Sequence, residues 1–244
     1  MTRRFRLPSL LRASALLLAL VPLASSVRPP RAYTSVASGG VVAKALPRRE
    51  RGTERERAAV RRRLAERGQG TYIAEMLAER DSSLARWPDR GGAPLAVWVQ
   101  SRSSVPRWSS TYVEEVRRAF RQWDGLRLPL RFVFTRDSAS ADVHVTFIDH
   151  FAEAISGRTK WARDDDWWIT DAEIILAVAH RNGPQLDDDS MHAMALHEIG
   201  HLLGLDHTDD PASIMAPRVR VRTLSRADRA TVRLLYTLPP GGVR

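Results

Sequence analysis

The stretch HEIGHLLGLDH, from His197 to His207, is the most informative part of the sequence for the fold and the site. It holds three of the seven histidines of a 244-residue sequence. Residues four apart lie one above the other on a helix, so His197 and His201 project from one face and can bind one ion. Catalytic zinc takes three protein ligands and keeps a fourth position for water. The spacing therefore predicts a helix that carries two ligands of a zinc site.

His207 can be the third ligand only if the helix ends before it and the chain turns back. Gly204 stands where that turn must begin, and glycine tolerates the left-handed conformation that such a turn requires. Glu198, beside the first ligand, can hold a metal-bound water and accept its proton. The alternatives are a helix with surface histidines and a closed structural metal site. The five fixed residues, the glutamate among them, favour a catalytic site over both.

The remaining pattern predicts one α+β domain of about 155 residues. Alternating apolar residues predict strands, and apolar residues at helical spacing predict helices. Thr111 with Glu114, and Ser225 with Asp228, have the spacing of capping boxes. The expected strands span 94–100, 130–135, 141–149, 157–164 and 169–178, and the expected helices span 111–125, 187–204 and 224–238.

These motifs resemble a known family. HEIGHLLGLDH is similar to the HExxHxxGxxH signature of the metzincin metalloproteases. SIMAP, from Ser213 to Pro217, resembles their Met-turn, in which a methionine, here Met215, lies beneath the metal. LSRADRATVRLLY resembles the closing helix of the matrixin branch, which includes the matrix metalloproteases and small bacterial relatives. With softer similarity in PLAVWV and ADVHVTF, the resemblance covers about residues 88–240.

The resemblance implies a metzincin fold: a twisted, mostly parallel five-stranded sheet with an antiparallel edge strand, an active-site helix and a C-terminal helix. It also implies a secreted zinc endopeptidase acting on proteins or peptides through a zinc-activated water, with Glu198 as general base. Substrate would extend along the 157–164 strand, and the 216–223 loop would wall the S1′ pocket. The alternative is a non-catalytic exported protein that binds a partner and keeps zinc for structure.

The chain departs from animal matrixins, because it has no cysteine to hold the zinc in a latent form. If an upstream segment enforces latency, either a group such as Asp81 caps the metal or the segment blocks the cleft. One catalytic zinc is the expected cofactor. His144, His150 and His180 leave a second zinc open, and the acidic run 164–166 leaves calcium open, although ordinary surface or core roles and a solvated turn are the simpler interpretations.

The N-terminal region predicts export. Arg3, Arg4 and Arg6 form a basic start, an apolar run follows over residues 13–23, and small residues follow at 24–26. We therefore expect a signal peptide over residues 1–27, with an uncleaved anchor as the alternative. Residues 28–87 are then an arginine-rich linker and helical extension or pro-region, and residues 88–244 the catalytic domain. We expect a monomer with no membrane span once the signal is removed.

The net charge of +10 is unevenly distributed. The first 87 residues hold 18 of the 38 basic side chains but only 7 of the 28 acidic ones, so the predicted domain is close to neutral. Only Lys44 and Lys160 are lysines, and this arginine bias need not mark a binding surface. A basic arm for nucleic acid or anionic lipid stays open, but without zinc-finger or RNA-binding motifs we expect no nucleic-acid partner.

Overall fold

A computed structural model of the chain describes residues 34–35, 54–181 and 183–242. The signal peptide predicted over residues 1–27 lies outside this part of the chain, as does most of the predicted linker. Within the described ranges, no helix is both long enough and apolar enough to cross a membrane.

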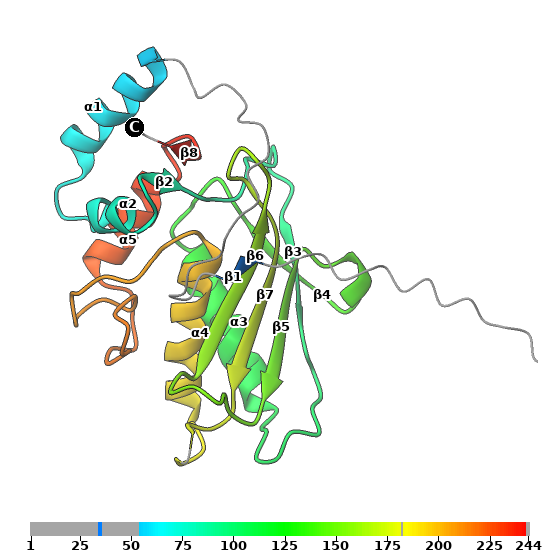
Figure 1. Ribbon diagram of the computed structural model, residues 1–244. Helices are drawn as coiled ribbons and strands as arrows, with labels where there is room; N and C mark the ends of the chain where they lie inside the picture. The colour runs from blue at the N-terminus through cyan, green and yellow to red at the C-terminus, as the bar shows by residue number, and fades with distance from the viewer. Residues whose placement is uncertain (1–33, 36–53, 182, 243–244) are drawn as a thin grey trace, which may run out of the picture. The chain divides into compact units, whose positions relative to one another are not determined.

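A six-stranded sheet is the largest structural element of the described chain (Figure 1). Its order is β1-β6-β7-β5-β3-β4. The contacts β3–β4, β3–β5 and β5–β7 are parallel, whereas β6 runs antiparallel to β7. Strands β3 to β7 thus confirm the predicted five-stranded sheet with an antiparallel strand. The bounds are β1 Thr34–Ser35, β3 Leu95–Val99, β4 Phe132–Thr135, β5 Val143–Ile148, β6 Gly157–Arg163 and β7 Ile169–Ala177.

The short strand β1 lengthens this sheet beyond β6. Its two residues pair antiparallel with Trp161 and Lys160. The edge of β6 that faces away from β7 therefore accepts an extended segment through backbone hydrogen bonds, which is the geometry of β-augmentation.

The strands form because every second side chain is apolar and buried. Along β3, for example, Leu95, Val97 and Val99 are buried while the residues between them are partly exposed. The same alternation occurs along β5. Successive side chains of a strand point to opposite faces, so this pattern fixes which face of the sheet receives the helices.

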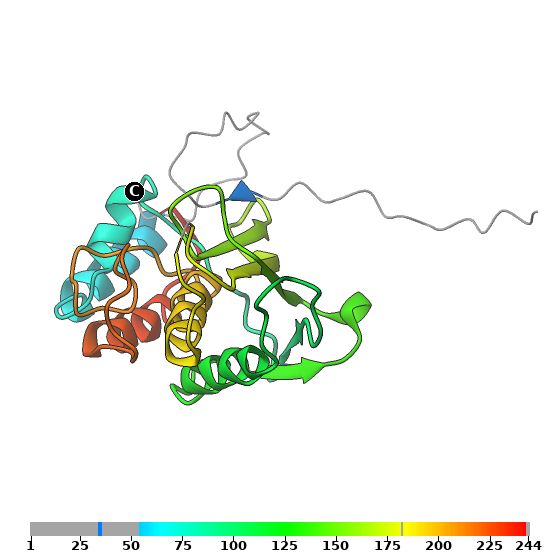
Figure 2. The same cartoon turned by 90° about the horizontal axis from the view of Figure 1, so that it is seen from below.

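Two helices, α3 (Thr111–Asp124) and α4 (Asp188–Leu202), pack against each other beside the sheet (Figure 2). The predicted capping box at Thr111 and Glu114 is wrong. Ser110 precedes the first helical residue and makes no side-chain cap. Thr111 lies inside the helix, and its hydroxyl donates to Asp188 at 2.6 Å instead. A contact with another helix thus replaces the local cap.

A second group of elements is formed by residues 54–84 and residues 226–242. It comprises α1 Glu54–Arg67, α2 Ile73–Glu79, β2 Ser83–Leu84, α5 Arg226–Leu235 and β8 Gly241–Gly242. Strands β2 and β8 pair antiparallel. The break between α1 and α2 contains Gly68 and Gly70. The capping box of α5 is confirmed, with Ser225 and Asp228 each accepting from the other's backbone N–H.

The hydrophobic core continues upstream of residue 88, where the sequence places the start of the catalytic domain. Large apolar side chains from this upstream stretch are buried in the same cluster as those of the sheet: Tyr72, Ile73, Met76, Leu84 and Trp87. The division of the chain into domains stays a prediction. From this burial we propose that residues 72–87 are part of the catalytic domain.

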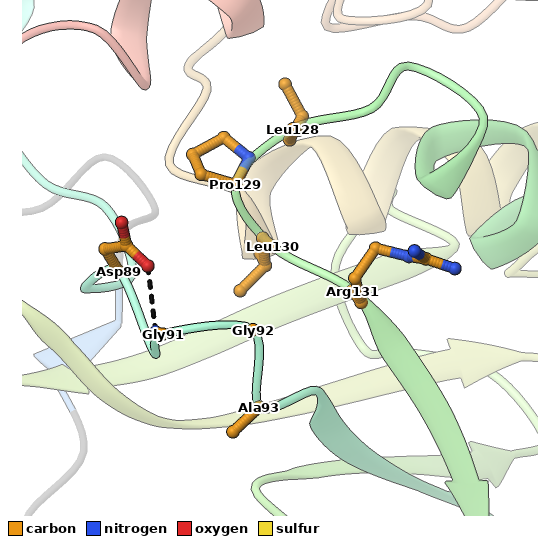
Figure 3. Close-up of a pocket in the computed structure, with 8 residues that line it drawn as sticks. All are labelled: Asp89, Gly91, Gly92, Ala93, Leu128, Pro129, Leu130 and Arg131. Atoms are coloured by element: carbon orange, nitrogen blue, oxygen red, sulfur yellow. Dashed lines mark hydrogen bonds between the residues drawn. The ribbon is translucent and has the colours of Figure 1, made fainter.

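One surface pocket lies apart from the predicted site. It is formed where the loops before β3 and β4 approach each other, and Asp89 accepts there from the backbone N–H of Gly91 at 2.9 Å (Figure 3). Its lining includes none of the predicted ligands. The lining residues are Asp89, Gly91, Gly92, Ala93, Leu128, Pro129, Leu130 and Arg131.

Truncation tests which residues before residue 88 are needed for the stability of the fold. A chain that begins at residue 54 should unfold cooperatively at nearly the temperature of a chain that begins at residue 28. A chain that begins at residue 88 loses five large buried side chains, each stabilising by about 1.5–3 kcal/mol. That loss, on the order of 10 kcal/mol, matches the whole stability of a typical domain. Circular dichroism melts would contradict this if the 88–244 chain unfolded like the longer ones.

Candidate metal centre and active site

Three histidine side chains meet at the end of α4. The Nε2 atoms of His197, His201 and His207 lie 3.1, 3.2 and 3.3 Å from one another. Ligands at about 2.0–2.1 Å around a tetrahedral zinc ion stand about 3.3 Å apart, so these distances fit zinc. Among the described residues this is the only group of three or more histidines, aspartates or glutamates whose ligand atoms come close enough together to hold a metal ion.

The opposite ring nitrogens fix the orientation of two of these ligands. His197 Nδ1 lies 2.7 Å from the carbonyl oxygen of Ile214, and His201 Nδ1 lies 2.9 Å from that of Leu205. A carbonyl only accepts, so each Nδ1 must carry the proton and each Nε2 presents a lone pair. Metal-binding histidines usually have such partners, which support the fit to zinc.

The third histidine arrives through the turn predicted at Gly204. This residue has a φ of 96°. The N–H of Leu205 donates to the carbonyl of Gly200 at 3.0 Å, and that of Gly204 donates to His201 at 3.0 Å. These two bonds define a Schellman motif, which ends the helix and reverses the chain. The turn also supplies the Leu205 carbonyl that orients His201.

The predicted methionine lies against the helix. Met215 is fully buried. A Cβ atom placed on Gly200 would stand 2.2 Å from the Met215 sulfur, so a larger residue there would require the Met215 side chain to move. The N–H of Thr208 donates to the Met215 carbonyl at 3.1 Å, which joins this turn to the residue after the third histidine.

Asp228 holds the methionine turn in place. Its carboxylate is fully buried and accepts from the Ser213 hydroxyl and from the Ile214 N–H, the latter at 3.1 Å. The same carboxylate accepts from the Ser225 N–H in the capping box and from the Tyr72 hydroxyl. The sequence identifies Asp228 only as a helix cap. Its bonds to the methionine turn could not be predicted from a local pattern.

Glu198 is buried at the junction of α4 and β6. Its carboxylate is 2.6 Å from the Thr159 hydroxyl, which also lies 2.9 Å from the Glu198 backbone carbonyl. A Cβ atom on Gly157 would be 2.3 Å from the Glu198 carboxylate, so glycine leaves the space that this side chain occupies. Sequence reasoning missed both Thr159 and Gly157, because neither belongs to a local motif.

Burial shifts the pKa values of the three histidines and of Glu198. It lowers the pKa of His197 to about 4 and lowers the pKa of His201 and His207 below the usual value. Burial raises the pKa of Glu198 to about 7, against the opposing effect of the Thr159 hydrogen bond. Neutral imidazoles are the form that binds metals, so the histidines are prepared as ligands.

The other candidate ligands of the sequence do not join this cluster. His144, His150 and His180 interact with Ser138, Asp149 and Ser156, respectively.

Acidic candidates also have local roles. Asp164 accepts from the N–H groups of Asp166 and Trp168, which shapes the acidic turn between β6 and β7. Asp81 is not part of the metal-binding group. In the 216–223 loop, Arg218, Arg220 and Arg222 are exposed, and Arg222 pairs with Asp189 at the start of α4.

Comparison with known proteins agrees with this geometry. Residues 149–237 match the family model described as matrixin. Metalloendoproteinase 1 of Glycine max is 26% identical over 159 residues, which cover 57% of this chain and 50% of the relative. Metalloendoproteinase 1-MMP of Arabidopsis thaliana is 31% identical over 146 residues, covering 49% and 36%. Matrix metalloproteinase-15 of Homo sapiens is 26% identical over 178 residues, covering 60% and 25%.

The aligned part thus spans half or less of the length of these relatives. The family match and these relatives show that the chain is similar to matrixin-type metalloproteases, which confirms the resemblance seen in the motifs, and the sheet is consistent with the fold that this resemblance implies. Matrixins are zinc-dependent, and the histidine cluster fits that metal.

Zinc binding is directly measurable. The purified chain should hold about one zinc ion, and saturation at 100 times the dissociation constant should stabilise the fold by about 2.7 kcal/mol. His201→Ala should lose the ion, because two histidines leave the site incomplete. His144→Ala, which changes a histidine outside the cluster, should retain it. Metal analysis by mass spectrometry checks both, and zinc retained by His201→Ala would contradict the ligand assignment.

Proposed function

We propose that this chain is an exported, monomeric zinc endopeptidase in which His197, His201 and His207 hold the metal and Glu198 is the general base. One observation carries the proposal: three imidazole nitrogens converge at 3.1–3.3 Å beside a buried glutamate of the same helix. The zinc, when bound, would polarise the scissile carbonyl and lower the pKa of a bound water toward about 7.

Side chains near the metal would carry out the proton transfers and position the group that makes them. Glu198 takes a proton from the attacking water and passes it to the leaving amine. Thr159 and Gly157 hold the Glu198 carboxylate, the first by a hydrogen bond and the second by leaving space. The carboxylate therefore keeps its position as the proton moves, which is the positioning that catalysis requires.

Peptide substrates would bind along β6. The pairing of β1 with Trp161 and Lys160 supports this proposal, because it places an antiparallel backbone on the same edge. Backbone hydrogen bonds would then supply affinity, and side-chain pockets would supply selectivity. In the loop over residues 216–223, Arg218 and Arg220 are exposed and would favour acidic or polar substrate side chains.

The alternative function is partner binding around a structural zinc. Such a protein has no use for a carboxylate beside the metal. The buried Glu198, with its own hydrogen-bond partner, therefore favours the enzyme.

Replacing the proposed base separates the two functions. Glu198→Gln should keep its zinc and lose cleavage of unfolded casein by about 100-fold or more, since general base catalysis contributes about 10²–10⁴-fold. Glu114→Gln, at an exposed ion pair on α3, is the matched control and should cleave normally. A chelator should abolish cleavage by the unmodified chain. Full activity in Glu198→Gln would exclude this residue as the base.

Gly157→Ala tests the space around the carboxylate. The added Cβ would displace Glu198, so cleavage should fall about 100-fold while zinc content stays the same. Gly125→Ala is the control, because its Cβ would meet no atom closer than 3.5 Å. Rates on a fluorogenic peptide and metal analysis measure both variants. Equal rates for the two would show that Glu198 does not need the position seen here.

A further inference from the structure

The C-terminal end of the zinc-binding helix is capped by a distant part of the chain. The last carbonyls of a helix have no partner within it. Here the Leu202 carbonyl accepts from Trp87 Nε1 at 2.9 Å, and the Gly204 carbonyl accepts from Arg80 Nη1 at 3.2 Å. Both donors precede the region that resembles matrixins. The end of α4 is therefore completed by the upstream segment 80–87.

The same segment also touches the backbone of the turn. A Cβ atom on Gly204 would lie 2.1 Å from the carbonyl oxygen of Ala85. Gly204 is thus required twice, once for its positive φ and once for this close approach. The turn that leads to His207 is shaped against the upstream chain rather than by α4 alone.

Arg80 makes the strongest of these contacts. Besides the Gly204 carbonyl, its guanidinium pairs with the carboxylate of Asp206, the residue before the third histidine. The two side chains are only 8% and 5% exposed. The guanidinium also lies 5.5 Å from the ring centre of Trp161 on β6. A planar group with fixed donors can hold two acceptors at once, which an ammonium does less well.

We propose that Arg80 is a positioning residue for the third metal ligand, His207. By binding Gly204 and Asp206 together, it fixes the backbone path between the helix end and His207. The proposal rests on the proposed zinc site. It follows that the stretch containing Arg80 must remain attached in the active protein, even if residues before it are removed.

The test compares two arginines of the same segment in the full-length chain without the proposed signal. Arg80→Met keeps the length of the side chain and removes the charge. Arg86→Met is the matched control, since Arg86 is also partly buried but donates to the backbone carbonyls of Leu238 and Trp87 rather than to Gly204 or Asp206. Zinc affinity is measured by competition with a coloured chelator, and the melting temperature is measured without metal.

Arg80→Met should weaken zinc binding by about 10–100-fold, the usual effect of losing a residue that supports a ligand. Arg86→Met should lower the melting temperature but change zinc affinity less than about twofold. Arg80→Lys should recover part of the affinity. In Arg80→Met combined with Asp206→Asn, the loss should be smaller than the sum of the two single losses, because no uncompensated buried charge is left.

Two outcomes would overturn the proposal. One is unchanged zinc affinity in Arg80→Met, and the other is an equal loss in Arg80→Met and Arg86→Met, which would indicate a purely structural role. If Arg80→Met does not fold, Asp206→Asn alone tests the same pair, and unchanged affinity there overturns the proposal. Absence of zinc binding in the unmodified chain would instead disprove the proposed function, so the two failures can be distinguished.

Discussion

The metal centre depends on where α4 ends. His197 and His201 need only a helix, but His207 needs the helix to stop within one turn of the second ligand. The Schellman bonds at Gly204 make that stop, and the Leu205 carbonyl released by the turn orients His201. Because a continued helix would carry His207 away from the other two, this one change of backbone direction determines whether three ligands converge.

The carboxylate of Asp228 fixes the turn that lies next to the proposed metal centre. Asp228 connects the cap of α5 to the turn that carries Met215, and it also accepts from Tyr72 of the upstream segment. Ile214, in the same turn, accepts from His197. The orientation of His197, the first of the proposed ligands, therefore depends on a buried residue outside the histidine cluster. Such supporting groups tune a metal site as much as its ligands do.

The sequence predicted the parts of the site that follow from local spacing. The helix that carries His197 and His201, the left-handed Gly204 and the capping box of α5 are visible in short patterns, and so are the strands. The failed capping box at Thr111 shows the limit, since a contact with Asp188 in another helix outweighs the local cap. The roles of Thr159 and Arg80 were not predicted either. Their partners are distant in sequence, and only the packing of the folded chain brings them together.

The pairing of β2 with β8 has a consequence for synthesis of the chain. It joins Ser83 to Gly242, so most of the described chain lies between the two partners. Contacts of such long sequence separation form late, because the intervening loop must first close. A growing polypeptide that has not reached Asp228 also lacks the acceptor for Ser213 and Ile214. The support of the proposed metal site is therefore completed only after Asp228 has been translated.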